Sequence, residues 1–305
     1  MFGGSAHPAL TAEICAFLQV PQQPVLLERF ANDCLEVQLQ ANCRERDVFI
    51  IQPLVKPVQE HLVELLLMTD AARGASAARV TAVIPHYAYA RSDKKDKPRI
   101  SIGARLVADL LVTAGVNRVL TLNLHSPQVH GFFSVPVDHL HALRELARYF
   151  RARDLSRTVV VAPDLGYAKS AADFARRLGV PVAAGAKERL SDTEVRITAI
   201  IGDVTGRDVI ILDDEISRGT TVFELLARLR DQGARSAAVA CTHGLFADNA
   251  LDKLAAADVT EVVCTNSAPV PGDHPKLHVL SVAPALAEAI GRIHDGESVS
   301  ALFQL

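Results

Sequence analysis

Short apolar segments rich in β-branched residues recur along this chain, separated by longer and more polar stretches. Each segment is almost unbroken in its apolar character, which is typical of strands buried on both faces of a sheet. The expected strands are Val48–Ile51, Arg79–Ile84, Arg118–Leu124, Thr158–Ala162, Val209–Leu212, Ser236–Cys241 and Glu261–Cys264.

Helical patterns lie between these segments, as in Val58–Ala72 and Ser101–Ala114. Gly115, Gly179 and Gly233 each stand where a helix needs a left-handed cap before the next strand. Strands that alternate with helices through such short joints favour right-handed crossovers. The pattern therefore predicts an α/β fold, with a mostly parallel sheet flanked by helices.

A chain of 305 residues is long enough for two domains of ordinary size, with one large domain as the alternative. Residues 136–143 follow one strand-helix series, and a second series begins near Thr158. We therefore expect a division near residue 141.

Composition restricts the class of protein. Hydrophobic residues make up 49% and charged residues 22%, which is not the composition of a disordered or fibrous chain. The net charge of −3 provides no general attraction to nucleic acid or to an anionic membrane, and the absence of Trp argues against base-stacking platforms. Five cysteines without CxxC spacing indicate reduced thiols rather than disulfides or zinc. No apolar run could span a bilayer, so we expect a cytoplasmic protein.

The most informative segment follows the apolar run Val209–Leu212. It contains Asp213 and Asp214 and then the turn Ser217, Arg218, Gly219, Thr220 and Thr221. Ligands of open α/β sheets collect at the carboxyl ends of strands. Carboxylates there can accept ribose hydroxyls, while turn amides and threonine hydroxyls can hold phosphate oxygens. The segment therefore predicts a sugar-phosphate site.

Four other strand-end segments carry candidate chemistry, each with a plainer alternative. The run Arg91–Arg99 is dense in cations and acids, and a solvated loop would have the same composition, but its position after a strand suits a polyphosphate. His125 and Asp164 could share one magnesium ion, or could serve as a structural hydrogen-bonder and a helix cap. Lys187 and Arg189 follow another apolar run, and residues 190–194 read either as a mobile lid or as an exposed turn.

The set of motifs resembles the ribose-phosphate diphosphokinase (phosphoribosyl pyrophosphate synthetase) family nearly from end to end. The closest segments are Arg79–Pro85, Tyr89–Lys97, Val129–Phe133, Thr242–Phe246 and Asp295–Ser300. The basic and acidic segment after Tyr-Ala-Arg is much more specific than the Asp-Asp turn, which phosphoribosyltransferases share generally.

The resemblance implies transfer of the β,γ-diphosphoryl group of ATP to the C1 hydroxyl of ribose 5-phosphate, giving phosphoribosyl pyrophosphate and AMP. It implies two phosphoribosyltransferase-type domains, 1–141 and 142–295, with the tail 296–305 packing back on the first. It also implies a homo-oligomer, as a hexamer or dimer, and Mg²⁺ as cofactor.

Residue roles follow from the same resemblance. Lys187 and Arg189 correspond to the catalytic pair. ATP would be bound by Phe30, Asn32, Arg91, Ser92, Asp96 and His125, with His125 and Asp164 as metal ligands. Ribose 5-phosphate would be bound by Asp164, Asp213, Asp214, Ser217, Arg218, Gly219, Thr220 and Thr221.

The chain departs from the family pattern in two loops. The family's sugar-phosphate loop usually continues Asp-Thr-Gly-Gly-Thr, where this chain has Ser217–Thr221. Tyr167 stands where a glycine is usual in the diphosphate-binding loop, which the resemblance matches to Asp164–Ala168. These departures keep two alternatives open. One is a non-catalytic regulatory homologue of the synthetase, and the other is a diphosphokinase for another sugar phosphate.

Overall fold

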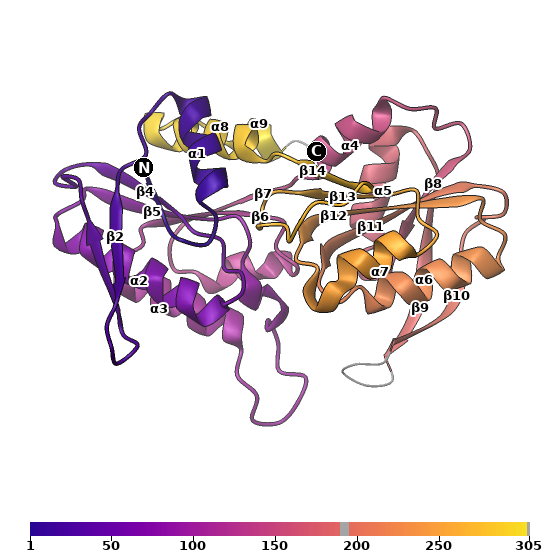
Figure 1. Ribbon diagram of the computed structural model, residues 1–305, viewed down its shortest axis with the longest axis horizontal. Helices are drawn as coiled ribbons and strands as arrows, with labels where there is room; N and C mark the ends of the chain where they lie inside the picture. The colour runs from indigo at the N-terminus through magenta and orange to yellow at the C-terminus, as the bar shows by residue number, and fades with distance from the viewer. Residues whose placement is uncertain (190–194, 304–305) are drawn as a thin grey trace. The chain divides into compact units, whose positions relative to one another are not determined.

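A computed structural model describes residues 1–189 and 195–303, and all of their side chains except those of 187–189, 195 and 303. The chain divides into two compact units, whose elements are labelled in Figure 1. The first comprises Met1–His141, Ser267–Pro269 and the stretch from Ser281 onward, and the second comprises Ala142–Asn266 and Val270–Leu280. Each has a largely parallel sheet flanked by helices, which confirms the α/β fold class.

The first unit is built on a five-stranded parallel sheet in the order β1-β4-β5-β6-β7, with a separate antiparallel hairpin of β2 and β3. The strands are β1 (Phe2–Gly3), β2 (Val25–Arg29), β3 (Leu35–Leu39), β4 (Asp47–Ile51), β5 (Arg79–Ile84), β6 (Arg118–Leu122) and β7 (Val137–Leu140). The helices are α1 (Pro8–Leu18), α2 (Val58–Gly74), η1 (Ala88–Arg91), α3 (Gly103–Ala114), η2 (Pro127–Phe132), α8 (Ala283–Asp295) and α9 (Ser300–Phe303).

Helix α8 is far from α1 in sequence but packs against it, so it belongs to the first unit. Arg79 donates a hydrogen bond of 2.9 Å to the carbonyl oxygen of Ile293, and Arg79 also pairs with Asp47. His294 Nδ1 lies 3.0 Å from the same Asp47 carboxylate. The expected second domain included all of 142–295, whereas the contacts of α8 place it in the first unit. Helix α9 contacts β7 of that unit.

The second unit is built on a seven-stranded sheet in the order β10-β9-β8-β11-β12-β13-β14, parallel except for the β9–β10 pair. The strands are β8 (Thr158–Ala162), β9 (Val182–Arg189), β10 (Val195–Ile201), β11 (Asp208–Ile216), β12 (Ser236–Gly244), β13 (Glu261–Thr265) and β14 (Leu277–Leu280). The helices are α4 (Leu143–Arg151), α5 (Ala168–Leu178), α6 (Thr220–Asp231), η3 (Ala247–Asn249) and α7 (Ala250–Ala256).

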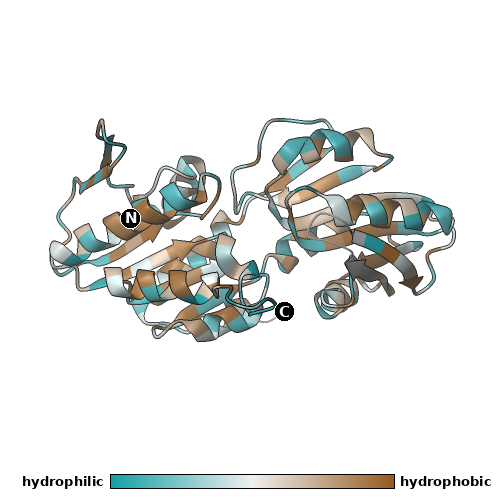
Figure 2. Cartoon of the chain, turned by 90° about the horizontal axis from the view of Figure 1, so that it is seen from below, coloured by the Kyte–Doolittle hydropathy of each residue, from teal (hydrophilic) through white to brown (hydrophobic). Residues whose placement is uncertain are grey.

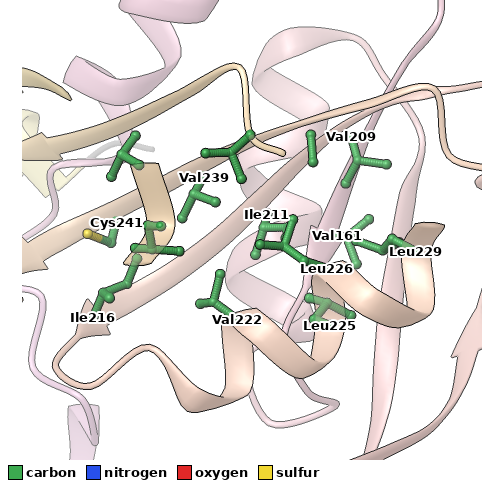
Figure 3. Close-up of a cluster of buried hydrophobic side chains, with 14 of the residues drawn as sticks. Val161, Val209, Ile211, Ile216, Val222, Leu225, Leu226, Leu229, Val239 and Cys241 are labelled. Carbon is green, nitrogen blue, oxygen red and sulfur yellow. The ribbon is translucent and has the colours of Figure 1, made fainter. Parts of the chain in front are cut away.

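Strand β11 sends alternate side chains into two hydrophobic cores. Val209 and Ile211 pack with the apolar face of α6, as Figure 3 shows. Ile210 and Leu212 pack in the opposite core with residues of α4 and α5. Because both faces are covered, the strand must be apolar at every position, which explains the unbroken pattern in the sequence. In Figure 2 the strands are largely brown, that is hydrophobic, whereas the helices beside them also carry teal, hydrophilic residues.

Two strands extend beyond the apolar segments that predicted them. The sequence ends one strand at Leu212, but β11 continues to Ile216 because β12 remains paired with it as far as Gly244. The sequence also treats Lys187 and Arg189 as residues beyond a strand. Their backbone instead lies within β9, because β10 returns antiparallel and pairs with both of them.

Candidate active site at the carboxyl ends of the strands

Asp213 and Asp214 lie within β11, beyond the last residue pair that β11 forms with β8. Asp214 is only 6% exposed, and its backbone N–H donates a hydrogen bond of 2.9 Å to Oδ1 of Asp213. Burial, followed by the charge of Asp214, raises the pKa of Asp213 well above its ordinary value. Two adjoining carboxylates in this environment favour ligands that bring hydroxyl donors or cations.

Asp164 lies at the same edge of the sheet. It follows β8, which pairs in parallel with β11 through Val161 and Ile211, so both strands end at this edge. The charge of Asp164 also contributes to the raised pKa of Asp213. Oδ1 of Asp164 accepts a hydrogen bond of 3.1 Å from the backbone N–H of Tyr167, immediately before α5 begins.

The turn after β11 leads into the N-terminus of α6. Gly219 has a φ of +74°, a left-handed conformation that suits glycine. Helix α6 then starts at Thr220, so its first backbone N–H groups lie next to the turn, where an anion is favoured. Arg218 extends to Asp248, with its Nε 2.8 Å from Oδ2, and both side chains are more than 60% exposed.

Strand β9 brings the backbone of the two expected catalytic cations toward this edge. It is parallel to β8 through the Ala184–Ala162 pair, and it continues past the end of β8 to Lys187 and Arg189. Gly185 permits this close approach, since a Cβ atom there would lie 2.8 Å from the carbonyl oxygen of Pro163. The side chains of Lys187 and Arg189, and all of residues 190–194, lie outside what the structure describes.

The first unit brings together a second group of expected residues. Arg91 and Ser92 follow β5, and His125 follows the adjacent strand β6. The two loops contact one another, because Gln128 Nε2 donates a hydrogen bond of 2.9 Å to Asp93 Oδ2. Ser92 Oγ accepts one from the N–H of Gly103, whereas Arg91, Asp96 and His125 are exposed. These loops present both cations and acids.

Phe30 and Asn32 lie elsewhere, near the tip of the β2–β3 hairpin. Phe30 is 50% exposed, and Asn32 Oδ1 accepts a hydrogen bond of 3.2 Å from the N–H of Cys34. The hairpin is connected to α2 by an ion pair between Arg29 and Glu60. An exposed aromatic ring on a hairpin is available for stacking on a base.

Among residues 1–189 and 195–303, no three His, Cys, Asp or Glu side chains cluster in a way that could hold a metal ion. In the described part of the chain, no helix is long and apolar enough to cross a membrane.

The sequence pattern predicted no role for two residues of the second unit, Asp248 and Tyr167. Asp248 pairs with Arg218, and its only signal is its position a few residues beyond β12. Tyr167 was noted only as a departure, but its hydroxyl is fully buried without a hydrogen-bond partner among the described residues.

Comparisons with known proteins agree over almost the whole chain. Residues 1–115 match the family described as the N-terminal domain of ribose phosphate pyrophosphokinase, and residues 188–304 match the phosphoribosyl synthetase-associated domain. The ribose-phosphate pyrophosphokinase of Deinococcus radiodurans is 52% identical over 310 residues, covering 99% of this chain and 97% of the relative. The corresponding Synechocystis protein is 42% identical, with 100% and 92% covered.

A solved structure gives the same result. The phosphoribosylpyrophosphate synthetase of Mycobacterium smegmatis superimposes with a TM-score of 0.91 at 39% identity, covering 97% of this chain and 98% of that one. The family resemblance seen in the sequence motifs is therefore confirmed. The chain belongs to the ribose-phosphate pyrophosphokinase family, whose members are transferases.

Proposed function

We propose that this chain transfers the β,γ-diphosphoryl group of ATP to the C1 hydroxyl of ribose 5-phosphate, producing phosphoribosyl pyrophosphate and AMP. The observation that carries the proposal is the arrangement at one edge of the second sheet. Asp164, the Asp213–Asp214 pair and the turn before α6 meet there, within a chain that is 52% identical to a ribose-phosphate pyrophosphokinase.

In the proposed complex, Asp213 and Asp214 accept hydrogen bonds from the ribose hydroxyls. Ser217 and the residues Gly219–Thr221 surround the 5-phosphate, because hydroxyls and helix N-terminal amides are suited to phosphate oxygens. Arg218 supplies a cation beside the same group.

ATP is assigned to residues of the first unit. Arg91 and Ser92 would contact the polyphosphate. Asp96 and His125 would contact a cation bound to the polyphosphate. Phe30 and Asn32 would recognise the base through an aromatic face and an amide.

The reaction exchanges one phosphorus–oxygen bond for another. The C1 oxygen of the pentose forms a bond to the β-phosphorus of ATP and releases its proton. The bond between the β-phosphorus and the oxygen that bridges the α- and β-phosphorus atoms breaks, and AMP leaves with that oxygen. The protein's task is mainly alignment and charge compensation. Lys187 and Arg189 would offset the negative charge of the migrating group.

Magnesium is the proposed cofactor, with His125 and Asp164 as its protein ligands. The carboxylate is a preferred type of magnesium ligand, and magnesium usually keeps waters and substrate oxygens beside one or two protein ligands. The ion would neutralise polyphosphate charge. We further propose a homo-oligomer, a hexamer or a dimer, that acts in the cytoplasm.

The altered turn favours a second candidate, a diphosphokinase for another sugar phosphate, because Ser217, Arg218 and Thr220 all depart from the family's usual loop. Both candidates are tested by incubating the pure protein with ATP, magnesium and a panel of pentose and hexose phosphates. We expect AMP and phosphoribosyl pyrophosphate to form in equal amounts with ribose 5-phosphate. A larger turnover with a different sugar phosphate would favour the second candidate. Absence of AMP with every sugar would contradict both.

A further inference from the structure

His125 follows a stretch of backbone that is held in an unusual conformation just beyond β6. Asn123 has a φ of +42°, in the left-handed region that residues other than glycine rarely adopt. Asn123 and Leu124 are each only 6% exposed, whereas His125 is exposed. A backbone conformation of this kind costs free energy and persists only where neighbouring contacts hold it. Those contacts therefore determine the backbone from which the His125 side chain extends.

Strand β7 supplies two of these contacts. The backbone N–H of Asn123 donates a hydrogen bond of 2.9 Å to the carbonyl oxygen of Leu140, next to the last residue pair of the β6–β7 ladder. The following N–H, that of Leu124, donates a hydrogen bond of 2.8 Å to a side-chain atom, Nε2 of His139. The residue directly before His125 is therefore attached to β7 through a histidine side chain.

His139 is itself held on a regular strand. It is paired with Thr121 of β6, and its ring centroid lies 4.5 Å from that of His141, with the two ring planes tilted by 51°. Because Nε2 accepts a hydrogen bond, the ring carries its proton on Nδ1. The imidazole of His139 is therefore a fixed acceptor directed at the backbone of Leu124.

The location of this hydrogen bond points to a role beyond packing. Ligands of open α/β sheets collect at the carboxyl ends of strands, and strained backbone is concentrated at ligand sites. The left-handed Asn123 and the contact of Leu124 with His139 both lie at the carboxyl end of β6, immediately before an exposed histidine. A contact that only satisfied a buried N–H would not need this position.

We propose that His139 is a positioning residue, which fixes the backbone at Leu124 and thereby orients His125 toward the polyphosphate of ATP and its cation. The inference rests on the proposed function, which gives His125 that role, and goes beyond it by assigning the group that orients His125. His139 acts through Leu124 and needs no contact of its own with the ligand.

The test uses two substitutions at one position and a control elsewhere in the same unit. His139→Leu removes the acceptor. His139→Gln is the conservative variant, because the glutamine Oε1 can reach the place of Nε2 and accept the same hydrogen bond. His294→Leu is the control, because it removes a histidine contact of 3.0 Å to Asp47 at the amino end of β4, the opposite end from the site.

The first measurement needs no ligand. Amide hydrogen exchange followed by NMR reports the opening of the Leu124 N–H, and the amide of Leu120 within β6 serves as the reference for global unfolding. Relative to Leu120, we expect Leu124 to exchange at least about tenfold faster in His139→Leu. The same ratio should stay at the parent's value in His139→Gln and in His294→Leu.

The second measurement is the affinity for nucleotide. Isothermal titration uses magnesium and α,β-methylene-ATP, in which the bridge between the α- and β-phosphorus atoms cannot be broken. We expect His139→Leu to bind about tenfold more weakly, roughly 1.4 kcal/mol, and His139→Gln to bind as the parent does. The KM for ribose 5-phosphate should not change, because the residues assigned to that substrate belong to the second unit. His294→Leu should keep the parent's affinity for the nucleotide.

Several outcomes would overturn the inference. One is unchanged exchange of Leu124 in His139→Leu, and another is faster exchange with the parent's affinity for the nucleotide. A glutamine variant as defective as the leucine variant would also contradict it, because the acceptor would then not be what matters. A parent that binds the nucleotide but forms no AMP with any sugar would instead overturn the proposed function, and a parent that does not bind the nucleotide would overturn both.

Discussion

At the scale of single residues, Asp213 and Asp214 of β11 and Arg218 in the turn before α6 dominate the expected behaviour. Arg218 and Asp248 form an ion pair with both side chains more than 60% exposed, and such pairs contribute little to stability. A dianionic phosphate bound at the N-terminus of α6 would compete with Asp248 for the guanidinium. The pair is therefore better placed to influence ligand binding than folding.

Opposite effects are expected from the two partners of this pair. Arg218→Thr should raise KM for ribose 5-phosphate by about five- to tenfold with little change in kcat, because a charge-assisted contact to the ground-state ligand is lost. Asp248→Asn should lower KM, because it releases Arg218 for the phosphate. Steady-state kinetics over a range of sugar phosphate measures both. A lower KM in Arg218→Thr would mean that the guanidinium obstructs the pocket.

The raised pKa of Asp213 predicts a gain of stability when its charge is removed. A group whose folded pKa is raised stabilises the protein fully below its unfolded pKa, and this contribution is lost as pH rises through the folded pKa. Asp213→Asn should therefore exceed the parent in free energy of unfolding at pH 8, by on the order of 1 kcal/mol. The gain should shrink at pH 5, and activity should be lost. Urea unfolding at both pH values tests the sign, and a larger gain at pH 5 would contradict it.

At the scale of elements, the site depends on where adjacent strands end. β9 passes the end of β8 only because Gly185 has no side chain to meet Pro163. β11 carries both acids past the same point because β12 is long enough to stay paired with it. Strand length, more than local turn chemistry, therefore places the candidate residues of the second unit along one edge.

Gly185→Ala should disturb this arrangement. A methyl group 2.8 Å from the carbonyl oxygen of Pro163 would displace backbone, at a cost of about 1–3 kcal/mol in unfolding free energy. Because Asp164 follows Pro163 directly, we also expect kcat to fall. Gly131→Ala is the control, since a Cβ atom there would meet nothing within 4 Å. Denaturant unfolding and the AMP assay report the two effects, and parent-like values for both would show that the strand can shift freely.

At the scale of the whole molecule, the end of the chain returns to the first unit through α8. Asp47 connects β4 with Arg79 and with His294 of that helix. Burial raises the pKa of Asp47, but the hydrogen bonds from Arg79 and His294 outweigh burial and leave the pKa below its ordinary value. The carboxylate is therefore stabilised in its charged form by Arg79 of β5 and by His294 of the docked helix.

Asp47→Asn should loosen this attachment. A depressed folded pKa contributes stability above the unfolded pKa, and this contribution is lost as pH falls through the folded pKa. We expect the variant to lose about 1–2 kcal/mol at pH 7, with the deficit shrinking below pH of about 4. Hydrogen exchange should show weaker protection in α8 and α1. Unchanged protection there, or a deficit that grows at low pH, would contradict the role of Asp47.

Much of this protein was determined by its sequence alone. Unbroken apolar runs such as Val209–Leu212 indicated strands covered on both faces, and Gly115, Gly179 and Gly233 all have positive φ at helix ends. These features are local, because periodicity and φ preference depend on neighbouring residues. The motifs that follow the strands are also local stretches of sequence, and they indicated the family.

Only the tertiary structure decided which strands extend, where α8 packs, and which buried polar groups lack a partner among the described residues. The lengths of β9 and β11 depend on pairing with β10 and β12, and the contact between α8 and α1 joins opposite ends of the chain. Tyr167 reads in the sequence as a substitution in a loop, and only tertiary packing buries its hydroxyl away from any partner within 1–189 and 195–303. Such properties depend on residues far apart in sequence, so no local pattern contains them.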